Sequence, residues 1–236
     1  MSVDFSIVVF AYNEVDGLER TVLRALEALD RFAKSSSEII IVDDGSTDGM
    51  GDVARALQRT HPRVKVSTHE TNRGIGEALR TGYAAATGDF VCAICGDGQF
   101  DPHEIADAAP FSDDEIVSFY RTSNEQYSPW RKVVSRANRA INATLVGVRL
   151  RDVNWCKVHP GKRVRALRIE LRSSLVESEL VAKLVADGCR VREVPSRYLP
   201  RLGGKPKGAS WPVLRRALKE TAKLIVVSRR HRMQRR

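Results

Sequence analysis

The sequence predicts a single α/β domain with a mostly parallel sheet flanked by helices. Two observations lead to this fold class. Short apolar runs alternate with segments of helical periodicity along the first half of the chain, which is the pattern of strand–helix units. The apolar runs also end in short turns rich in Asp, Gly and Asn. At 236 residues, the chain has the length of one large domain.

The first half contains five expected strands separated by four turns or helices. The run at 38–42 is apolar throughout, which is typical of a strand buried on both faces of a parallel sheet. Apolar side chains recur every three or four residues in the segments between the runs, which predicts helices. Strands are expected at 5–10, 38–42, 64–68, 90–95 and 115–120, and helices at 15–33, 52–57 and 78–88.

The second half is more irregular. A polar segment at 120–130 predicts a mobile loop, and a Gly, Lys and Pro-rich loop is expected at 200–210. A strand or turn at 152–158 is expected to join the sheet. The remaining elements are helices at 131–146, 175–187 and 212–230 and a strand at 191–194.

The turn after the fourth strand is the most informative one. It reads Gly96-Asp97-Gly98-Gln99, and Asp101-Pro102 then opens a predicted helix with Asp as N-cap and Pro at the first position. A carboxylate at such a strand end, beside glycines that allow close approach to the backbone, suits a metal-bound phosphate. The alternative is an ordinary Asp-Gly turn.

Acidic and polar side chains follow three strands of the acidic half, at Tyr12–Glu14, Asp43–Asp44 and Asp97–Gln99. The carboxyl ends of parallel strands meet at one edge of the sheet, where ligands bind. Carboxylates accept hydrogen bonds from base and ribose and bind Mg²⁺ or Mn²⁺. The pattern therefore predicts a metal-dependent nucleotide site. Gly74-X-Gly76 lacks the third glycine of a dinucleotide fingerprint and follows no strand directly, which argues against an NAD site.

Charge is divided unevenly along the chain. Residues 1–120 contain 10 Lys and Arg against 21 Asp and Glu, whereas residues 121–236 contain 29 against 8. This asymmetry predicts an anionic partner for the second half, either a membrane surface, a phosphorylated lipid or nucleic acid. Solvated surface charge is the alternative.

The cysteines and the ends of the chain bear on compartment. Cys92 and Cys95 would point to opposite faces of a strand, so free thiols are expected. No apolar run is long enough to span a membrane, and no signal peptide precedes the first strand. We therefore expect a cytoplasmic protein.

Four ordered motifs resemble those of the inverting glycosyltransferases of family 2, which have the Rossmann-like GT-A fold. They lie at Val8–Glu14, Ile41–Asp48, Asn72–Gly76 and Gly96–Pro102. Softer matches to the dolichol-phosphate mannosyltransferase branch are Glu179, Glu193-Val194-Pro195 and Pro200–Lys207. The resemblance implies a GT-A domain at 1–210, with a nucleotide-sugar half at 1–110, an acceptor half at 111–210 and a basic amphipathic helix and tail at 211–236.

The resemblance also implies roles for individual residues. The base and ribose of a nucleoside-diphosphate sugar would contact Ala11, Tyr12, Glu14 and Asp43, with Asp44 and Arg73 in the same nucleotide-sugar site. Asp97 and Gln99 would contact the diphosphate and an Mg²⁺ or Mn²⁺ ion. The acceptor phosphate would be bound by Arg121, Arg131 and Arg136, and the basic loop with Arg201 and Lys207 would close on the phosphates. Catalysis would depend on Asp97, Arg121 and Arg136.

Two positions depart from the family pattern. Phe10 replaces a usual Pro, which affects only the turn. Cys95 replaces the first Asp of the Asp-X-Asp motif, and a neutral thiol is a poor ligand for a hard cation. Metal binding is therefore expected to be weak, and metal independence is an alternative.

The implied reaction transfers a hexose to a polyprenyl (dolichol-like) phosphate at the membrane surface, with inversion at the anomeric carbon. Two alternatives stay open at this point. The same fold could glycosylate a soluble small molecule such as a secondary metabolite, or the protein could be a non-catalytic binder of anions or nucleic acid. Nucleic acid is not expected, because no aromatic stacking surface accompanies the arginines. The apolar stripe of the last helix (Val213, Leu214, Ala217, Leu218, Leu224, Ile225) with its basic neighbours predicts a helix in the interface of an anionic membrane, or else a helix packed on the domain.

Overall fold

The computed structural model describes residues 4–123, 129–203 and 211–235, without the side chains at 129–131, 134 and 212–214. A seven-stranded sheet forms its centre, in the order β3-β2-β1-β4-β6-β5-β7. The strands are β1 (Phe5–Ala11), β2 (Glu38–Asp43), β3 (Val64–Thr68), β4 (Phe90–Cys95), β5 (Glu115–Arg121), β6 (Lys157–Pro160) and β7 (Arg190–Ser196). The α/β fold class predicted from the sequence is confirmed.

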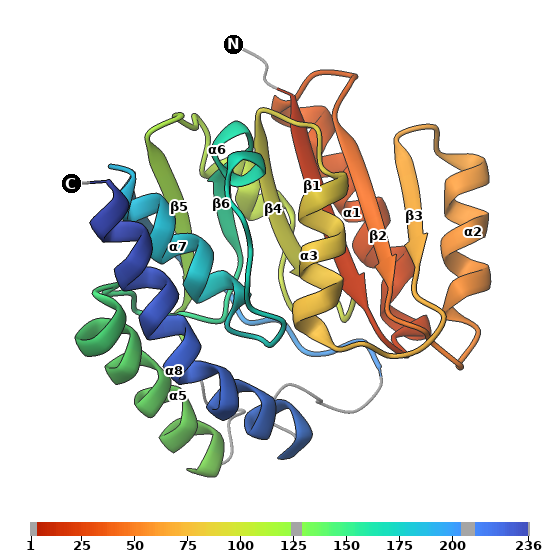
Figure 1. The fold of residues 1–236 in the computed structure, drawn as a ribbon. Helices are drawn as coiled ribbons and strands as arrows, with labels where there is room; N and C mark the ends of the chain where they lie inside the picture. Colours follow the sequence, from red (N-terminus) through yellow and green to blue (C-terminus); the bar gives the residue numbers. More distant parts are fainter. Residues whose placement is uncertain (1–3, 124–128, 204–210, 236) are drawn as a thin grey trace.

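Helices cover both faces of the sheet, as Figure 1 shows. The first half contributes α1 (Val15–Phe32), α2 (Met50–Thr60), α3 (Ile75–Ala85) and α4 (His103–Asp107). The second half contributes α5 (Pro129–Ile141), the π-helix η1 (Asn142–Val146), α6 (Gly161–Ala166), α7 (Val176–Ala186) and α8 (Trp211–Gln234). The helices α5 and α8 lie beside each other at the lower left of Figure 1.

Two hydrophobic cores lie on the two sides of the sheet. Successive residues of β1 alternate between them, with Ile7 and Val9 in one core and Val8 in the other, because successive side chains of a strand point to opposite faces. One core packs against α1, α2 and α4, and the other against α3, α6 and α7. This double burial explains the continuous apolar runs of β1, β2 and β4.

The sheet is parallel except at β6. This strand runs antiparallel to both β4 and β5. The strand or turn expected at 152–158 does join the sheet, because a turn at 153–155 leads into β6, which begins at Lys157. Its residues are held by polar contacts: Asp152 pairs with Arg121, and the ammonium of Lys157 donates to the backbone oxygens of Val153 and Trp155.

Several boundaries differ from the sequence expectation. The structure extends α2 at both ends, ends α5 at Ile141 in a π-helical turn and adds the short helix α6, which the sequence did not predict. Six residues give too few periods for hydrophobic spacing to reveal a helix. The last helix is longer than expected, because its basic final turns are anchored to Asp187 through His231 and Arg235.

The four cysteines are free thiols, as expected. Cys92 packs into the same core as Cys156. Cys95 is the last residue of β4, three residues further along, so strand alternation places it on the opposite face from Cys92.

Candidate functional site

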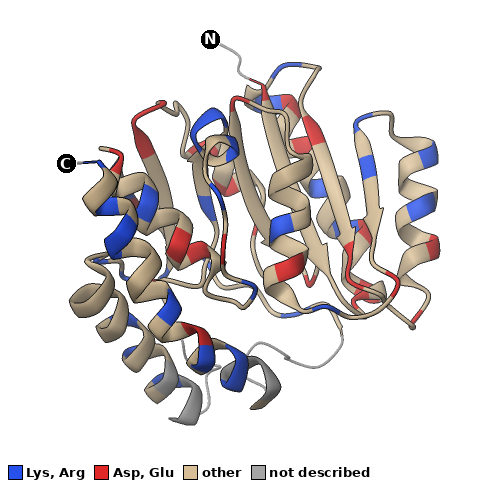
Figure 2. Ribbon diagram, in the orientation of Figure 1, with Lys and Arg blue, Asp and Glu red and all other residues tan. Residues whose placement is uncertain are grey.

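The strands β1, β2 and β4 are parallel and end at one edge of the sheet, the lower edge in Figure 1. Asp43 is the last residue of β2, and Glu14, Asp44 and Asp97 stand in the turns that follow the three strands. All four side chains are buried. Figure 2 shows acidic segments gathered at this edge and several basic segments along α8. The convergence of three strand ends predicted from the sequence is confirmed. We refer to this edge as the carboxyl edge.

An arginine connects two of these turns. One guanidinium nitrogen of Arg201 donates to the Asp97 carboxylate at 2.7 Å, and the other donates to Glu14. The Arg201 side chain is 14% exposed, and its Nε has no partner among the described residues. Burial acts against the charge, but the Asp97 and Glu14 carboxylates together raise the pKa of Arg201. The carboxyl edge therefore carries a fixed, buried cation.

Asp97 also shapes its own loop. Its second carboxylate oxygen accepts the backbone N–H of Gln99 at 3.0 Å, and its backbone oxygen accepts the N–H of Leu202. Leu199 donates in turn to the backbone oxygen of Gln99. Residues 199–203 thus lie across the turn after β4 as a strap. The sequence predicted a basic loop at 200–210. No pattern in it indicated that the backbone of this loop pairs with the turn after β4.

The thiol of Cys95 lies next to these charges. Burial raises its pKa well above the usual value, and the carboxylates of Asp97 and Glu14 raise it further. The thiol is therefore protonated at neutral pH. A protonated thiol adds no negative charge at the position where the family pattern has a carboxylate.

The second acidic turn has two different carboxylates. Asp44 accepts hydrogen bonds from the backbone N–H groups of Arg73 and Gly74 and contacts the ring of His69. It therefore holds the turn that precedes α3. Asp43 accepts only the N–H of Ser46 through its side chain among the described contacts, which leaves it the better placed of the two to meet a ligand.

The other residues assigned to the nucleotide-sugar site lie at the same edge. Ala11 is buried against Gly96, Tyr12 is half-buried, and Gln99 is half-buried in the turn after β4. Arg73 is exposed, and its backbone oxygen accepts a hydrogen bond from Arg216 of α8.

The basic residues expected to bind phosphate differ in their surroundings. Arg121 is bound by Asp152 through two hydrogen bonds of 2.6 and 2.8 Å, and its guanidinium lies 4.5 Å from the ring centre of Trp155. Arg136 is exposed on α5. The side chain of Arg131 and all of Lys207 lie outside the described residues.

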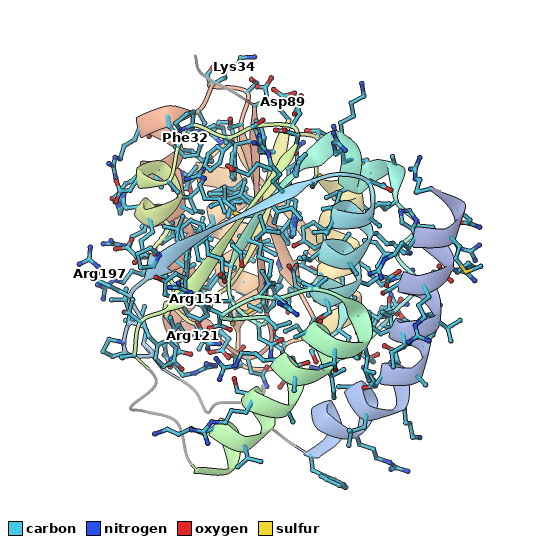
Figure 3. The ribbon with its side chains drawn as sticks, turned by 90° about the vertical axis from the view of Figure 1, so that its left-hand side faces the viewer. Phe32, Lys34, Asp89, Arg121, Arg151 and Arg197 are labelled. Carbon is cyan, nitrogen blue, oxygen red and sulfur yellow. The ribbon has the colours of Figure 1, made fainter. Side chains whose placement is uncertain are left out.

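Figure 3 labels three arginines of the acceptor half. Arg121 and Arg151 lie near each other, away from Lys34 and Asp89 at the opposite end of the molecule, and Arg197 points outward. Arg151 stacks on Tyr120 at 4.7 Å. An aromatic group beneath Arg121, formed by Phe100, Trp155 and Tyr198, connects this region to the turn after β4. Neither the pairing of Arg121 with Asp152 nor this stacking carried a signal in the sequence.

Glu179, one of the matches to the dolichol-phosphate mannosyltransferase branch, holds a neighbouring segment of backbone in place. It is fully buried and accepts the backbone N–H groups of Glu170 and Leu171 and the ammonium of Lys183. The segment it holds continues to Arg172 and Ser173, whose backbone packs against Gly76 at the start of α3. Glu179 therefore holds the segment that packs against the start of α3, and it makes no contact at the carboxyl edge among the described contacts.

The donor set at the carboxyl edge fits a divalent ion that binds together with a diphosphate. Asp97 supplies a hard carboxylate oxygen, but Cys95 is protonated and Arg201 already neutralises Asp97 and Glu14. Among the described residues, no group of three or more His, Cys, Asp and Glu side chains could hold an ion by itself. Most ligands of such an ion would have to come from the diphosphate and water.

No helix in the described ranges 4–123, 129–203 and 211–235 is long and apolar enough to cross a membrane.

Comparison with solved structures supports the fold. A glucosyl-3-phosphoglycerate synthase from Mycobacterium tuberculosis, solved with Mn²⁺, UDP and phosphoglyceric acid, superposes with a TM-score of 0.68 at 18% identity, over 98% of this chain and 78% of that one. A mannosyltransferase from Pyrobaculum calidifontis, solved with GDP-Man and Mn²⁺, gives a TM-score of 0.60 at 16% identity, over 98% and 74% of the two chains. The fold is that of the GT-A glycosyltransferases.

Sequence relatives carry more specific names. An undecaprenyl-phosphate 4-deoxy-4-formamido-L-arabinose transferase from Edwardsiella ictaluri is 30% identical over 86% of this chain and 62% of its own length. An uncharacterized glycosyltransferase from Nostoc sp. is 34% identical over 50% of this chain and 33% of its own length. An undecaprenyl-phosphate mannosyltransferase from Micrococcus luteus is 24% identical over 85% of both chains.

The chain thus spans between a third and two thirds of the length of the first two of these relatives. The family model described as glycosyl transferase family 2 matches residues 6–156. That range contains β1 from its second residue, β2 to β5 and the turns that carry Glu14, Asp44 and Asp97. The chain belongs to glycosyl transferase family 2.

Proposed function

We propose that the protein transfers a hexose from a nucleoside-diphosphate sugar to a polyprenyl phosphate, with inversion at the anomeric carbon. The observation that carries the proposal is the carboxyl edge itself, where Glu14, Asp43 and Asp97 meet and Arg201 lies on two of them. Two relatives that cover most of this chain are named as undecaprenyl-phosphate sugar transferases, which supports the choice of acceptor.

The acidic half of the chain binds the nucleoside of the donor, and the basic half binds the phosphates. In the acidic half, the Asp43 carboxylate accepts hydrogen bonds from the base or ribose, and the Tyr12 ring packs against them. In the basic half, Arg201 carries the positive charge that a diphosphate needs, and its partnerless Nε leaves a donor for a phosphate oxygen. Arg136, exposed on α5, and Arg121, which is paired with Asp152, supply cations for the acceptor phosphate.

The reaction needs no general base from the protein. An oxygen of the acceptor phosphate, already ionised at neutral pH, attacks the anomeric carbon. The bond from that carbon to the diphosphate breaks, and its electron pair leaves with the nucleoside diphosphate. The guanidinium of Arg201, released from Asp97, stabilises the charge that develops on this leaving group.

A divalent ion, when bound by Asp97, Gln99 and the diphosphate, would supply further neutralisation of the same charge. The solved neighbours with Mn²⁺ support the use of such an ion in this fold. Because Cys95 replaces a carboxylate, we propose that the ion binds weakly before the nucleotide is present.

A panel of nucleotide sugars screened by thermal shift, with and without Mn²⁺, identifies the donor, because a ligand of the native state raises the melting temperature. Transfer of a radiolabelled sugar from that donor to a short-chain polyprenyl phosphate then tests the acceptor. A soluble phosphorylated acceptor, such as phosphoglyceric acid, is the comparison. Transfer to the soluble acceptor alone would overturn the polyprenyl assignment, and absence of any donor binding would overturn the function.

A further inference from the structure

Exposed large apolar side chains are concentrated on one part of the molecule. In the part of the chain that the structure describes, seven such side chains are exposed, and six of them lie on α5, η1 and α8: Val133, Leu145, Trp211, Leu218, Val226 and Met233. Their exposed fractions range from 41% to 76%. Single exposed apolar residues are normal, but a concentration on one pair of helices marks an interaction surface.

Four of the six form a line along α8. Trp211, Leu218, Val226 and Met233 follow each other at intervals of seven or eight residues, which places them on one face of a helix. The opposite face, with Leu224, is buried against the domain. The stripe predicted from the sequence is therefore split, because Leu224 packs inward whereas Leu218 points outward.

Basic side chains accompany this apolar line. Arg215, Lys219 and Arg229 are exposed on the same side of α8, and they form no ion pair with any described residue. We call Trp211, Arg215, Leu218, Lys219, Val226, Arg229 and Met233 the outer face of α8. Over α5, η1 and α8 the sequence holds eleven Lys and Arg and a single acid, Glu220. Glu220 is occupied by the backbone N–H groups of Arg172 and Ser173.

Helix α8 is fixed to the domain and to η1, which continues α5. Arg232 of α8 donates to the backbone oxygen of Val146 in η1 at 2.8 Å, and His231 pairs with Asp187 after α7. Figures 1 and 3 both show α5 and α8 side by side, next to the carboxyl edge. Whatever binds the outer face is therefore held at a fixed place relative to the candidate site.

We propose that the outer face of α8, with α5 beside it, lies in the headgroup region of an anionic membrane. The charge of the face argues for this occupant, since apolar side chains interleaved with unpaired cations are the pattern of a helix lying in the membrane interface. A second copy of the same face would bring its cations against like charges. A nucleic acid would leave Trp211, Leu218 and Met233 without an apolar partner.

This inference rests on the proposed function, because docking to a membrane serves a reaction whose acceptor, a polyprenyl phosphate, is anchored in a bilayer. Docking through the outer face would bring the carboxyl edge near the headgroups where the acceptor phosphate lies. The membrane contact itself has a test that requires no turnover.

The experiment measures flotation of the whole chain with vesicles, in the absence of nucleotide sugar. Vesicles of phosphatidylcholine mixed with an equal amount of phosphatidylglycerol should bind the protein at low salt, and vesicles of phosphatidylcholine alone should not. The double variant Leu218→Ser/Met233→Ser should weaken binding about tenfold. Its control is Leu23→Ser, which removes the seventh exposed apolar side chain, on α1, and should leave binding unchanged.

The charge is tested separately. Arg215→Gln/Arg229→Gln should weaken binding about tenfold and reduce its salt dependence. The matched control Arg59→Gln/Lys162→Gln removes two exposed cations on α2 and α6 and should bind as the wild type does. Circular dichroism and thermal shift with the donor nucleotide confirm in each variant that the fold and the donor site are intact.

Three results would overturn the proposal. One is absence of binding to the phosphatidylglycerol vesicles at low salt. Another is a wild-type dimer in solution that Leu218→Ser/Met233→Ser dissociates, which would make the face an interface between copies. The third is vesicle binding that a short RNA duplex displaces and that the apolar variant does not weaken. If the wild-type protein binds the donor nucleotide but not the phosphatidylglycerol vesicles, this inference alone is rejected and the proposed function stands.

Discussion

The carboxylate of Asp97 connects the turn after β4, the strap and α1. It accepts the Gln99 N–H, and it shares the Arg201 guanidinium with Glu14 at the start of α1. A buried ion pair contributes little net stability but is costly to break on one side. Stability therefore does not explain this pair at the carboxyl edge, and we expect it to take part in binding.

Replacing Asp97 by Ala should lower sugar transfer by about 10²- to 10³-fold, because it removes the carboxylate that positions Arg201 and the diphosphate. The protein should remain folded but become less stable, because Arg201 loses one carboxylate and keeps its pair with Glu14. Steady-state turnover with the identified donor and circular dichroism provide the two measurements. Asp113→Ala, at an exposed acid, is the control. Near-normal turnover of a folded Asp97→Ala protein would exclude this turn from the mechanism.

Arg201 and an added divalent ion should compete for the same carboxylates. In the wild type, Mn²⁺ without nucleotide should hardly change the melting temperature. Arg201→Gln leaves Glu14 and Asp97 facing each other without a cation, so it should lower the melting temperature, and Mn²⁺ should restore it. Arg20→Gln, at an exposed arginine on α1, is the matched control.

Cys95→Asp is the companion variant. It restores the second carboxylate of the Asp-X-Asp motif and should tighten Mn²⁺ binding on the order of tenfold. Isothermal titration with Mn²⁺ in the absence of nucleotide measures the change. If neither Arg201→Gln nor Cys95→Asp changes Mn²⁺ affinity, the carboxyl edge is not the metal site.

At the scale of elements, the segment between α6 and α7 depends on one side chain of α7. Glu179 accepts two backbone N–H groups and the Lys183 ammonium, and Lys183 donates to the backbone oxygen of Arg168. The sequence match at Glu179 is therefore explained by support of the wall that packs on α3 at Gly76, not by contact with a ligand.

Glu179→Gln should lower the free energy of unfolding by about 3 kcal/mol, because the buried Lys183 ammonium loses its carboxylate partner at 2.6 Å and, of the described carboxylates, keeps only Glu170 at 3.4 Å. Urea denaturation measures the loss. Glu19→Gln, an exposed glutamate of α1, should change stability little and serves as the control. A loss equal to that of the control would show that the segment is held by other contacts.

At the scale of the whole molecule, a buried polar network joins the two halves. The Glu177 carboxylate on α7 contacts His159 of β6 at 3.2 Å and lies 3.8 Å from the ammonium of Lys157, and it accepts the hydroxyl of Tyr83 from α3. Burial opposes ionisation of Glu177, but His159, Lys157 and Tyr83 outweigh it and lower its pKa to about 2.

This lowered pKa makes global stability sensitive to acid. A carboxyl group whose pKa is lower in the folded state contributes stability above its unfolded pKa of 4.5 and loses that contribution as the pH falls towards about 2. The contribution is about 3 kcal/mol at neutral pH. Glu177→Gln should be less stable than the wild type at neutral pH, and its stability should fall less steeply below pH 4.5. Urea denaturation across this pH range tests both, and parallel curves for the two proteins would contradict the assignment.

The order of the elements and the place of the candidate site followed from the sequence. Strands buried on both faces need long apolar runs, and the polar turns at their ends are local features, so the edge formed by Tyr12–Glu14, Asp43–Asp44 and Asp97–Gln99 could be predicted. The short helix α6 could not, because six residues carry too little periodicity. The antiparallel direction of β6 could not either, because it is defined by the pairing with β4 and β5 and not by the side-chain pattern of four residues.

The sequence alone determined which residue types reach the carboxyl edge, since strand alternation and turn chemistry are set within a few residues along the chain. Only the tertiary structure decided how their charges combine. Arg201 meets Glu14 from 187 residues away, Arg121 is bound to Asp152, and the stripe of α8 is divided between a packed face and an outer face. The physical reason is that electrostatic and apolar contacts depend on distance in space, and no pattern along the chain records which distant side chain occupies the other side of a contact.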